Sequence, residues 1–379
     1  MIRVLHVHSP FEWGGVETWL LQLLRHIDRK RVSLDFFTNA TRPGVEEMIR
    51  ASGGRVLWAP PTARPWSYLK GLTSVLQTEG PYDVVHTHFL DHAGIVLWCA
   101  KRAGVPVRIA HSHEVSNRIG WARRKYFEAG RRLLRKHATM GFAASRKAAC
   151  FLYGDSWTGD PRWSVQLCGI DLAPFEASED KTSLRASLGI PPDAFVIGHV
   201  GRFVPQKNHA FLLGVLKELV KRDRRTLFLL VGDGPLQETI RRRAEADGVS
   251  RWILFAGCRP DVPRLMLHAM DAFILPSLSE GLGVVVVEAQ AAALPCVISD
   301  TVPGEADVVP GLVRRRSLNE PPATWAEELL VCRQKLRLSN ESALEILRNS
   351  PFNIKNSARR LERAYLEAAT DVAGKSLSA

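Results

Sequence analysis

The sequence is poor in cysteine and contains no closely spaced pair of cysteines. Only six are spread over 379 residues, and no two of them form a Cys-x-x-Cys motif. Zinc knuckles and disulfide frameworks depend on such spacing, so the sequence argues against both. Several of the six lie in apolar runs, which is typical of reduced core residues.

Long hydrophobic runs are also missing. No apolar stretch reaches the roughly 20 residues that a membrane-spanning helix needs. The first residues, Met1–Leu5, lead directly into a strand pattern, which predicts a chain without a signal peptide. We therefore expect a cytoplasmic protein, either soluble or bound peripherally to the inner face of the membrane.

Acidic residues are outnumbered, with 39 Asp and Glu against 51 Lys and Arg, which gives a formal charge of +12. This excess predicts an anionic partner: a phosphate-bearing substrate, an anionic lipid or a nucleic acid. The sequence shows no RNA-binding motif with interleaved aromatic residues and no helix-turn-helix signature. We therefore expect no nucleic-acid partner.

Predicted strands and helices alternate along the chain, in one series from Ile2 to Ala144 and a second from Phe195 onward. Alternation is typical of parallel, doubly wound sheets, whose ligands bind at the carboxyl ends of the strands. The chain is long for a single core, so two α/β domains are expected. The predicted boundaries are an N-terminal domain over 1–172, a polar linker over 173–193, a C-terminal domain over 194–350 and a helical segment over 351–379.

Ser277–Glu288, which we call the clamp segment, places two acids and two glycines after the apolar strand Ala272–Pro276. We predict a helix that begins near Gly283. Four consecutive valines favour a strand by propensity. However, Cys296–Ser299 supplies the next strand, and parallel neighbours need a crossover between them.

The N-terminus of this helix predicts a phosphate site. The N–H groups of Gly283, Val284 and Val285 would face the carboxyl edge of the sheet, where a helix N-terminus attracts anions. Glu280 and Glu288 are separated by eight residues, roughly 12 Å of helix. One carboxylate can therefore reach the sugar and the other the ribose of a nucleotide sugar. Two solvated acids on a surface helix remain the alternative.

Six histidines lie at or near predicted strand ends. His-x-His spacing also arises from strand alternation, and no carboxylate with matching spacing accompanies these residues. We therefore predict no metal ion there. The six are His6, His8, His86, His88, His111 and His113.

The Glu-x7-Glu pair, in its setting Ser-Glu-Gly-Leu-Gly…Val-Glu-Ala-Gln-Ala, resembles the retaining glycosyltransferases of family 4. His199–His209, Val231–Leu236 and Asp261–Pro263 fit the same family, and the likeness is closest to its exopolysaccharide-biosynthesis branch. The resemblance implies the GT-B fold, in which two doubly wound, Rossmann-like domains face each other across a cleft. It further implies acceptor binding by the N-terminal domain, donor binding by the C-terminal domain, and a C-terminal helix, 351–379, that returns to the N-terminal domain.

The resemblance also assigns roles at the donor site. Glu280 would orient the donor sugar, and Glu288 would bind the ribose hydroxyls. Arg202 and Lys207 would neutralise the diphosphate in place of a divalent metal, since the chain has no Asp-x-Asp signature. A solvated basic loop is the alternative for these two cations. Gly15 would oppose the diphosphate, and we expect neither a metal nor another cofactor.

Two assignments carry alternatives. The main chain at Cys258 and Arg259 would meet the base edge, and an ordinary strand-to-helix turn is the alternative. His111 matches the family histidine that faces the reacting hydroxyls, with His113 as the competing candidate. The chain also departs from the family, which has asparagine in place of Cys168, and often has proline where Gly283 stands and glycine where Ala293 stands.

We therefore predict a retaining glycosyltransferase that moves a sugar, expected to be a hexose carried by UDP, to a glycan or lipid-diphosphate-linked acceptor in polysaccharide biosynthesis. A sugar-nucleotide epimerase of the same architecture is the alternative, and a basic nucleic-acid-binding protein is a further one. The sequence does not specify the sugar, the nucleotide, the acceptor, the linkage or the oligomeric state.

The segment Trp121–His137 predicts a basic amphipathic helix with seven Arg and Lys residues. Such a helix suits an anionic membrane surface. It equally suits a helix whose apolar stripe packs on its own sheet. The stripe consists of Ala122, Tyr126, Ala129 and Leu133, with Phe127 and Leu134 beside it.

Overall fold

A computed structural model describes residues 1–8, 10–11, 14–115, 121–334 and 338–377. The chain divides into two compact units. The first unit combines Met1–Gly169 with the C-terminal segment Ile354–Ala379, and the second unit is Ile170–Asn353. Each unit contains one sheet, and all described strand pairs are parallel. The predicted architecture of two doubly wound α/β domains is confirmed.

The sheet of the first unit has seven strands in the order β3-β2-β1-β4-β5-β6-β7. The order reverses between β1 and β4, which is where doubly wound sheets bind ligands at their carboxyl edge. The strands are β1 (Ile2–Val7), β2 (Val32–Thr38), β3 (Arg55–Trp58), β4 (Val84–Thr87), β5 (Val107–Ser112), β6 (Met140–Ala143) and β7 (Trp163–Val165).

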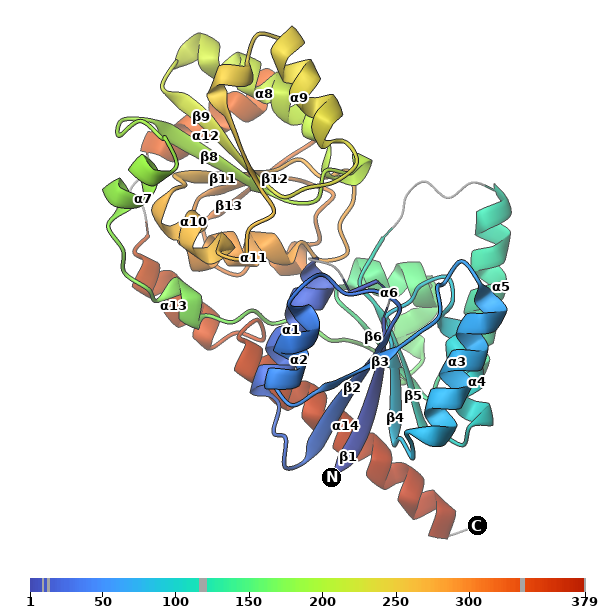
Figure 1. Cartoon of the computed structure of the whole chain (residues 1–379). Helices are drawn as coiled ribbons and strands as arrows, with labels where there is room; N and C mark the ends of the chain where they lie inside the picture. The colour runs from blue at the N-terminus through green and yellow to red at the C-terminus, as the bar shows by residue number, and fades with distance from the viewer. Residues whose placement is uncertain (9, 12–13, 116–120, 335–337, 378–379) are drawn as a thin grey trace. The chain divides into compact units, whose positions relative to one another are not determined.

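Helices cover both faces of this sheet. Figure 1 shows α3 and α4 together on one side, with α5 next to them, and α1 with α2 on the other. The helices are α1 (Gly15–His26), α2 (Val45–Ala51), α3 (Pro65–Thr78), α4 (Ala93–Arg102), α5 (Trp121–His137), α6 (Arg146–Tyr153), the 3-10 helix η1 (Asp155–Gly159) and α14 (Ile354–Leu377).

The C-terminal helix α14 belongs to the first unit although it follows the second unit in sequence (Figure 1). It packs against α1, β1 and β5. Glu362 pairs with Arg31 at 2.7 Å, and the hydroxyl of the fully buried Tyr365 lies 2.7 Å from Nδ1 of His86 in β4. Buried contacts of this kind make the helix an integral part of the unit.

The sheet of the second unit has six strands in the order β10-β9-β8-β11-β12-β13, which reverses between β8 and β11. The strands are β8 (Phe195–Val200), β9 (Thr226–Val231), β10 (Ile253–Gly257), β11 (Ala272–Leu275), β12 (Cys296–Ser299) and β13 (Val313–Arg316). The α-helices are α7 (Lys181–Ser187), α8 (His209–Arg222), α9 (Gln237–Ala246), α10 (Val262–His268), α11 (Val284–Ala291), α12 (Pro322–Gln334) and α13 (Asn340–Arg348). The 3-10 helices are η2 (Ala173–Phe175), η3 (Pro205–Lys207), η4 (Ser250–Trp252) and η5 (Gly304–Ala306).

The polar segment 173–193, predicted as a linker, lies within the second unit. Helix α7 is capped by Asp180, whose carboxylate accepts hydrogen bonds from the backbone N–H groups of Thr182 and Ser183. Arg185 is buried and pairs with Asp271 at 2.6 Å. A buried ion pair needs both partners, so this segment is fixed to its sheet.

Candidate functional site

The clamp segment follows β11 at the carboxyl edge of the second sheet, next to the reversal of strand order. Helix α11 begins at Val284, so the predicted helix is confirmed despite its four valines. Gly283 is the N-cap, with φ 82° in the left-handed region. Proline cannot adopt this angle because its ring fixes φ near about −65°. A glycine at this position therefore matches the local backbone.

Glu280 and Lys207 form an ion pair at this edge. Lys207 Nζ donates to Glu280 Oε1 at 2.5 Å, and both side chains are largely buried. The loop after β8 is also hydrogen-bonded to the clamp segment, because the side-chain amide of Gln206 donates to the carbonyl of Ser279 at 2.6 Å. The structure thus brings together two predicted donor-site residues that lie far apart in the sequence. Arg202 lies on the same loop and is exposed.

Glu288 lies one turn into α11 and is partly exposed. Burial of its carboxyl group raises the pKa to about 7. Within the part of the chain that the structure describes, this carboxylate has no hydrogen-bonding or ionic partner. A buried carboxyl group with a raised pKa and no hydrogen-bonding partner is typical of a binding site, where a ligand supplies the missing donors.

Two neighbouring loops set the shape of this edge. The loops after β8 and β9 are joined by a hydrogen bond from the N–H of Phe203 to the carbonyl of Asp233, at 2.7 Å. A Cβ at Gly232 would lie 2.1 Å from the carbonyl oxygen of Gly201. Only glycine permits this approach, which accounts for the Gly-Asp-Gly run that carried part of the family resemblance.

The remaining predicted donor-site residues lie at element ends. Cys258 is exposed directly after β10, and Arg259 pairs with Asp261 at 2.7 Å. This hydrogen-bonded pairing raises the pKa of the Arg259 guanidinium. Gly15 begins α1 in the first unit, and a Cβ there would meet nothing within 4 Å. Its main chain therefore lies beside open space.

Five histidines meet in the first unit where β1, β4 and β5 end, at its own reversal of strand order. Burial lowers the pKa of each below its usual range, so all are neutral near pH 7. The sequence placed their strands correctly, but it did not show that their rings would touch. They are His6, His86, His88, His111 and His113.

The structure separates the two reaction-centre candidates. His111 is fully buried. In this conformation its ring is shielded from solvent, so contact with a reacting hydroxyl requires a rearrangement of the site. His113 lies just beyond the end of β5 and is partly exposed. Accessibility therefore favours the competing candidate.

Two groups of these histidines bring ring nitrogens within 4.8 Å of one another: His6 with His86 and His88, and His88 with His111 and His113. Within both groups, however, ring nitrogens hydrogen-bond to one another, for example His6 Nδ1 to His88 Nε2 at 2.9 Å. Such contacts use lone pairs that a metal would need.

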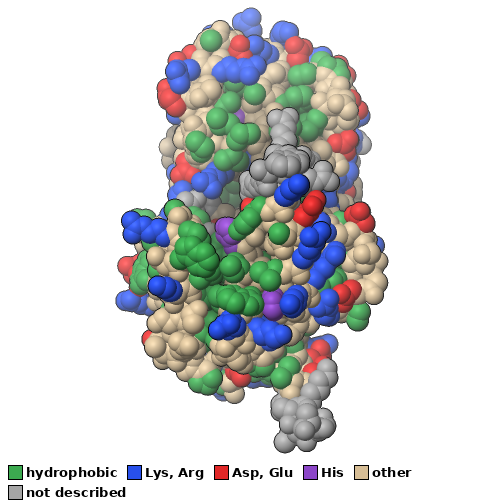
Figure 2. Space-filling model, turned by 90° about the vertical axis from the view of Figure 1, so that its right-hand side faces the viewer, with side chains coloured by type: hydrophobic (Ala, Val, Ile, Leu, Met, Phe, Trp, Pro, Cys, Tyr) green, Lys and Arg blue, Asp and Glu red, His purple; other side chains and the backbone are tan. Residues whose placement is uncertain are grey.

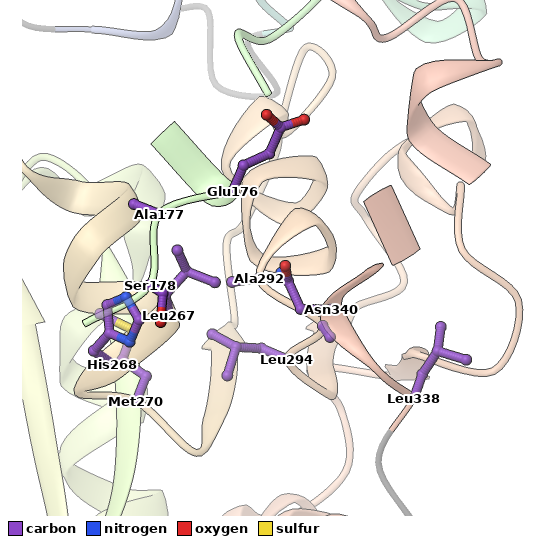
Figure 3. Close-up of a pocket in the computed structure, with 11 residues that line it drawn as sticks. Glu176, Ala177, Ser178, Leu267, His268, Met270, Ala292, Leu294, Leu338 and Asn340 are labelled. Carbon is purple, nitrogen blue, oxygen red and sulfur yellow. The ribbon is translucent and has the colours of Figure 1, made fainter. Parts of the chain in front are cut away.

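A cavity of about 390 Å³ lies elsewhere in the second unit. It is bounded by the C-terminal ends of α10 and α11, and Figure 3 shows His268, Leu294 and Asn340 around it. The ends of these helices lie at the amino edge of the sheet, where β11 and β12 begin. None of the predicted site residues lines this cavity, so it is separate from the clamp segment.

Comparison with known proteins gives two family matches. Residues 180–327 match the model described as glycosyl transferases group 1, and residues 14–152 match a glycosyl transferase 4-like domain. A Bacillus subtilis (strain 168) protein, EpsF, named as a glycosyltransferase, is 36% identical over 372 residues, which cover 96% of each chain.

Two further proteins are similar to the chain. An Escherichia coli protein named UDP-Gal:alpha-D-GlcNAc-diphosphoundecaprenol alpha-1,3-galactosyltransferase is 26% identical, over 79% of each chain. The crystal structure of Anabaena HepE in complex with UDP-glucose has a TM-score of 0.72 at 17% identity, over 100% of each chain. The fold is GT-B, as the resemblance implied.

None of the described helices combines the length and the apolar character that crossing a bilayer requires.

Proposed function

The chain belongs to the group 1 glycosyltransferases, with a family 4-like N-terminal domain, and from this membership we propose that it transfers a hexose from a UDP-hexose with retention at the anomeric carbon. The proposed acceptor is a glycan or a lipid-diphosphate-linked saccharide. The names of two similar proteins support both choices, since one is a UDP-Gal:alpha-D-GlcNAc-diphosphoundecaprenol galactosyltransferase, and HepE was crystallised with UDP-glucose. The comparisons give no support to the epimerase alternative.

The observation that carries the proposal is the ion pair of Glu280 with Lys207 just before the N-terminus of α11, with the unpartnered Glu288 one turn into the same helix. In the proposed complex the diphosphate lies at the helix N-terminus, where backbone N–H groups and the helix dipole favour negative charge. Lys207 and Arg202 neutralise the charge that develops on the leaving diphosphate. Glu288 accepts hydrogen bonds from the ribose hydroxyls, and Glu280 orients the sugar.

In the proposed reaction the acceptor hydroxyl attacks the anomeric carbon from the face that the diphosphate leaves. The bond from the anomeric carbon to the acceptor oxygen forms as the bond to the diphosphate breaks. The hydroxyl proton passes to the departing phosphate oxygen, so no side-chain nucleophile is required. The partly exposed ring of His113 is proposed to contact the reacting hydroxyls.

A thermal-shift screen against nucleotide sugars tests the proposal. A ligand present at 100 times its dissociation constant stabilises the folded protein by about 2.7 kcal/mol. UDP-hexoses are expected to raise the melting temperature more than UMP or a free hexose does. If no nucleotide diphosphate or nucleotide sugar shifts the transition, the proposed donor site is wrong.

The proposed diphosphate contacts predict that Arg202→Ala and Lys207→Ala each lower turnover by about tenfold to 100-fold, because a hydrogen bond to a charged group is worth about 1.5–3 kcal/mol. Lys207→Arg, which keeps the positive charge, should lose less. Lys217→Ala removes a cation of the same unit that pairs with Asp247 instead, and it should leave turnover unchanged.

Because protein cations take the place of a metal in this proposal, EDTA is expected to leave transfer intact. Initial rates are to be measured after dialysis against EDTA and again after addition of Mn²⁺. Complete loss of activity in EDTA with recovery in Mn²⁺ would contradict the metal-free assignment.

The basic helix α5 is proposed to hold the first unit at an anionic membrane surface by charge. Phe127 and Leu134 of this helix are buried in the core of the first unit, whereas Tyr126 and Ala129 of the predicted apolar stripe are exposed. The helix therefore packs on its own domain through the residues beside that stripe. The side chains of 121–124 lie outside the described residues. Lys125, Arg132 and Lys136 are exposed, and Figure 2 shows basic side chains gathered on the face of the unit that carries α4 and α5.

Replacing Lys125, Arg132 and Lys136 with glutamine is expected to reduce sedimentation with anionic liposomes strongly, since each basic residue near such a surface contributes about 1 kcal/mol. The matched control replaces the three arginines of α9, Arg241, Arg242 and Arg243, and should sediment like the wild type. Equal binding to neutral and anionic vesicles would remove the hypothesis.

A further inference from the structure

Seven side chains of the first unit form one continuous line of hydrogen-bonding contacts, which we call the histidine chain. It joins residues from β1, β4, β5, their following loops, α14 and the end of the unit's main segment. In order, it runs Cys168–His113–His88–His6–Tyr365–His86–His111.

The contacts follow one rule along the whole line: each joins the Nδ1 side of one ring to the Nε2 side of the previous one. His113 Nε2 lies 2.9 Å from His88 Nδ1, and His88 Nε2 lies 2.9 Å from His6 Nδ1. His6 Nε2 lies 3.5 Å from the hydroxyl of Tyr365, which lies 2.7 Å from His86 Nδ1.

The two ends follow the same rule. His86 Nε2 lies 3.2 Å from His111 Nδ1, and His111 Nε2 is the buried end of the line. At the other end, Cys168 Sγ lies 3.7 Å from His113 Nδ1.

A neutral imidazole has one N–H donor and one bare acceptor nitrogen, and each contact in the line can hold only one proton. If one ring carries its proton on Nε2, its neighbour must accept at Nδ1 and carry its own proton on Nε2. The hydroxyl of Tyr365 keeps the direction of the hydrogen bonds the same on both sides, since it accepts from one ring and donates to the next. All five rings must therefore share one tautomer.

We propose that Tyr365 is a positioning residue for His113. Tyr365 acts through the histidine chain, because its hydroxyl makes His113 adopt the tautomer that all five rings share. The hydroxyl of Tyr365 is the only member of the line, among the described side chains, that links the His6 side to the His86 side. The shared tautomer then decides whether the Nδ1 atom of His113 faces the thiol of Cys168, 3.7 Å away, as a donor or as an acceptor. The relevance to catalysis rests on the proposed function.

Burial supports the neutral state that this argument needs, because desolvation lowers the pKa of His6 to about 3 and holds the other four well below their usual range. The members of the line include no carboxylate that could balance a buried positive charge. A proton or a divalent cation added to the line would thus remain uncompensated in a medium of low polarity.

The test is ¹⁵N NMR of histidine-labelled protein, which distinguishes Nδ1–H from Nε2–H rings directly. In the wild type at pH 7, all five rings are expected to show the same tautomer. A mixture of tautomers among the five, or nitrogen shifts of a metal-bound ring with stoichiometric metal in the purified protein, would overturn the proposal. Because the wild-type spectrum is decisive alone, the test does not depend on a variant that folds.

Tyr365→Phe gives the second readout. The edge of a phenyl ring accepts no hydrogen bond and lies more favourably against a lone pair than against an N–H group. His6 Nε2 and His86 Nδ1, which face residue 365, should therefore both be unprotonated. His6, His88 and His113 should then carry Nδ1–H, while His86 and His111 carry Nε2–H. Tyr153→Phe removes another buried hydroxyl of the same unit, which donates to the backbone outside the line, and should keep one shared tautomer.

The tautomer pattern and donor binding separate the two proposals. Tyr365→Phe should lower kcat several-fold with the donor KM unchanged, because the side chains proposed to bind the donor, Arg202, Lys207, Glu280 and Glu288, lie in the other unit. If the wild-type protein shows one shared tautomer but does not bind a nucleotide-sugar donor, the proposed function is wrong and the proposal for Tyr365 still stands. Normal transfer with the wild-type tautomer pattern in Tyr365→Phe would defeat the role assigned to this tyrosine.

Discussion

Replacing Glu280 with alanine is expected to lower kcat by about 100-fold while the dissociation constant for UDP changes by only a few-fold. In the proposed complex the carboxylate orients the transferred sugar, and it also fixes the ammonium group of Lys207 at 2.5 Å. Loss of a buried, charged hydrogen bond costs about 1.5–3 kcal/mol, and misplacement of Lys207 adds to this during transfer. Initial rates and nucleotide titrations on the same preparations measure the two effects.

Two controls separate chemistry from folding. Glu280→Gln keeps the size of the side chain and removes the charge, so it should fold well and remain slow. Glu238→Ala removes an exposed acid of α9 that pairs at 3.6 Å with Arg242, and it should behave like the wild type. Wild-type turnover in both Glu280 variants would remove this residue from the donor site.

Replacing Glu288 with glutamine is expected to weaken UDP-hexose binding by about tenfold to 100-fold and, at the same time, to stabilise the free protein. The carboxylate has no partner among the described residues, and burial raises its pKa to about 7. Ionisation is thus disfavoured in the folded state until a ligand supplies hydroxyl donors. With allowance for partial exposure, removing the charge should stabilise the protein by about 2 kcal/mol above pH 7.

The pH dependence has a defined sign. A carboxyl group with a higher pKa when folded than when unfolded keeps its proton longer in the folded state, so stability falls as pH rises from about 4.5 to about 7. The stabilising effect of Glu288→Gln should therefore be absent near pH 4.5 and complete above pH 7. Chemical denaturation of the free protein at several pH values measures it.

Donor binding should follow the opposite trend, because the ribose hydroxyls require the ionised carboxylate. Affinity for UDP-hexose in the wild type should rise about tenfold between pH 6 and pH 8, since only about a tenth of a group with pKa near 7 is ionised at pH 6. Calorimetric titration should show a flat profile for Glu288→Gln. An equal slope in both proteins would place the titrating group elsewhere.

The sequence predicted what local pattern determines. Alternating apolar runs gave the strands, and the requirement for a crossover gave α11 in spite of its valines. The sequence predicted that Glu280 and Lys207 belong to the same site, but it did not predict their ion pair. Their contact depends on how two loops 73 residues apart fold against each other. Fixation of the polar segment 173–193 depends on Asp271, a distant acid that the local composition does not reveal.

The histidines show where prediction from sequence stops. His-x-His spacing placed the rings at strand ends, and similarity favoured His111, but only the packed structure shows that this ring is buried and that His113 is partly exposed. Tyr365 gave no signal at all, since it lies in the last helix, 279 residues from His86, which it contacts. Side-chain contacts over such separations follow from tertiary packing and not from local periodicity.

The most direct test of the proposed chemistry is a ¹H NMR time course of the protein with UDP-hexoses and no added acceptor, in which water takes the place of the acceptor hydroxyl. A retaining transferase is expected to release UDP and free hexose slowly, with the α anomer appearing before mutarotation. If the β anomer appears first, retention is wrong. If a new sugar nucleotide forms without release of UDP, the protein is an epimerase and the proposed transfer is contradicted.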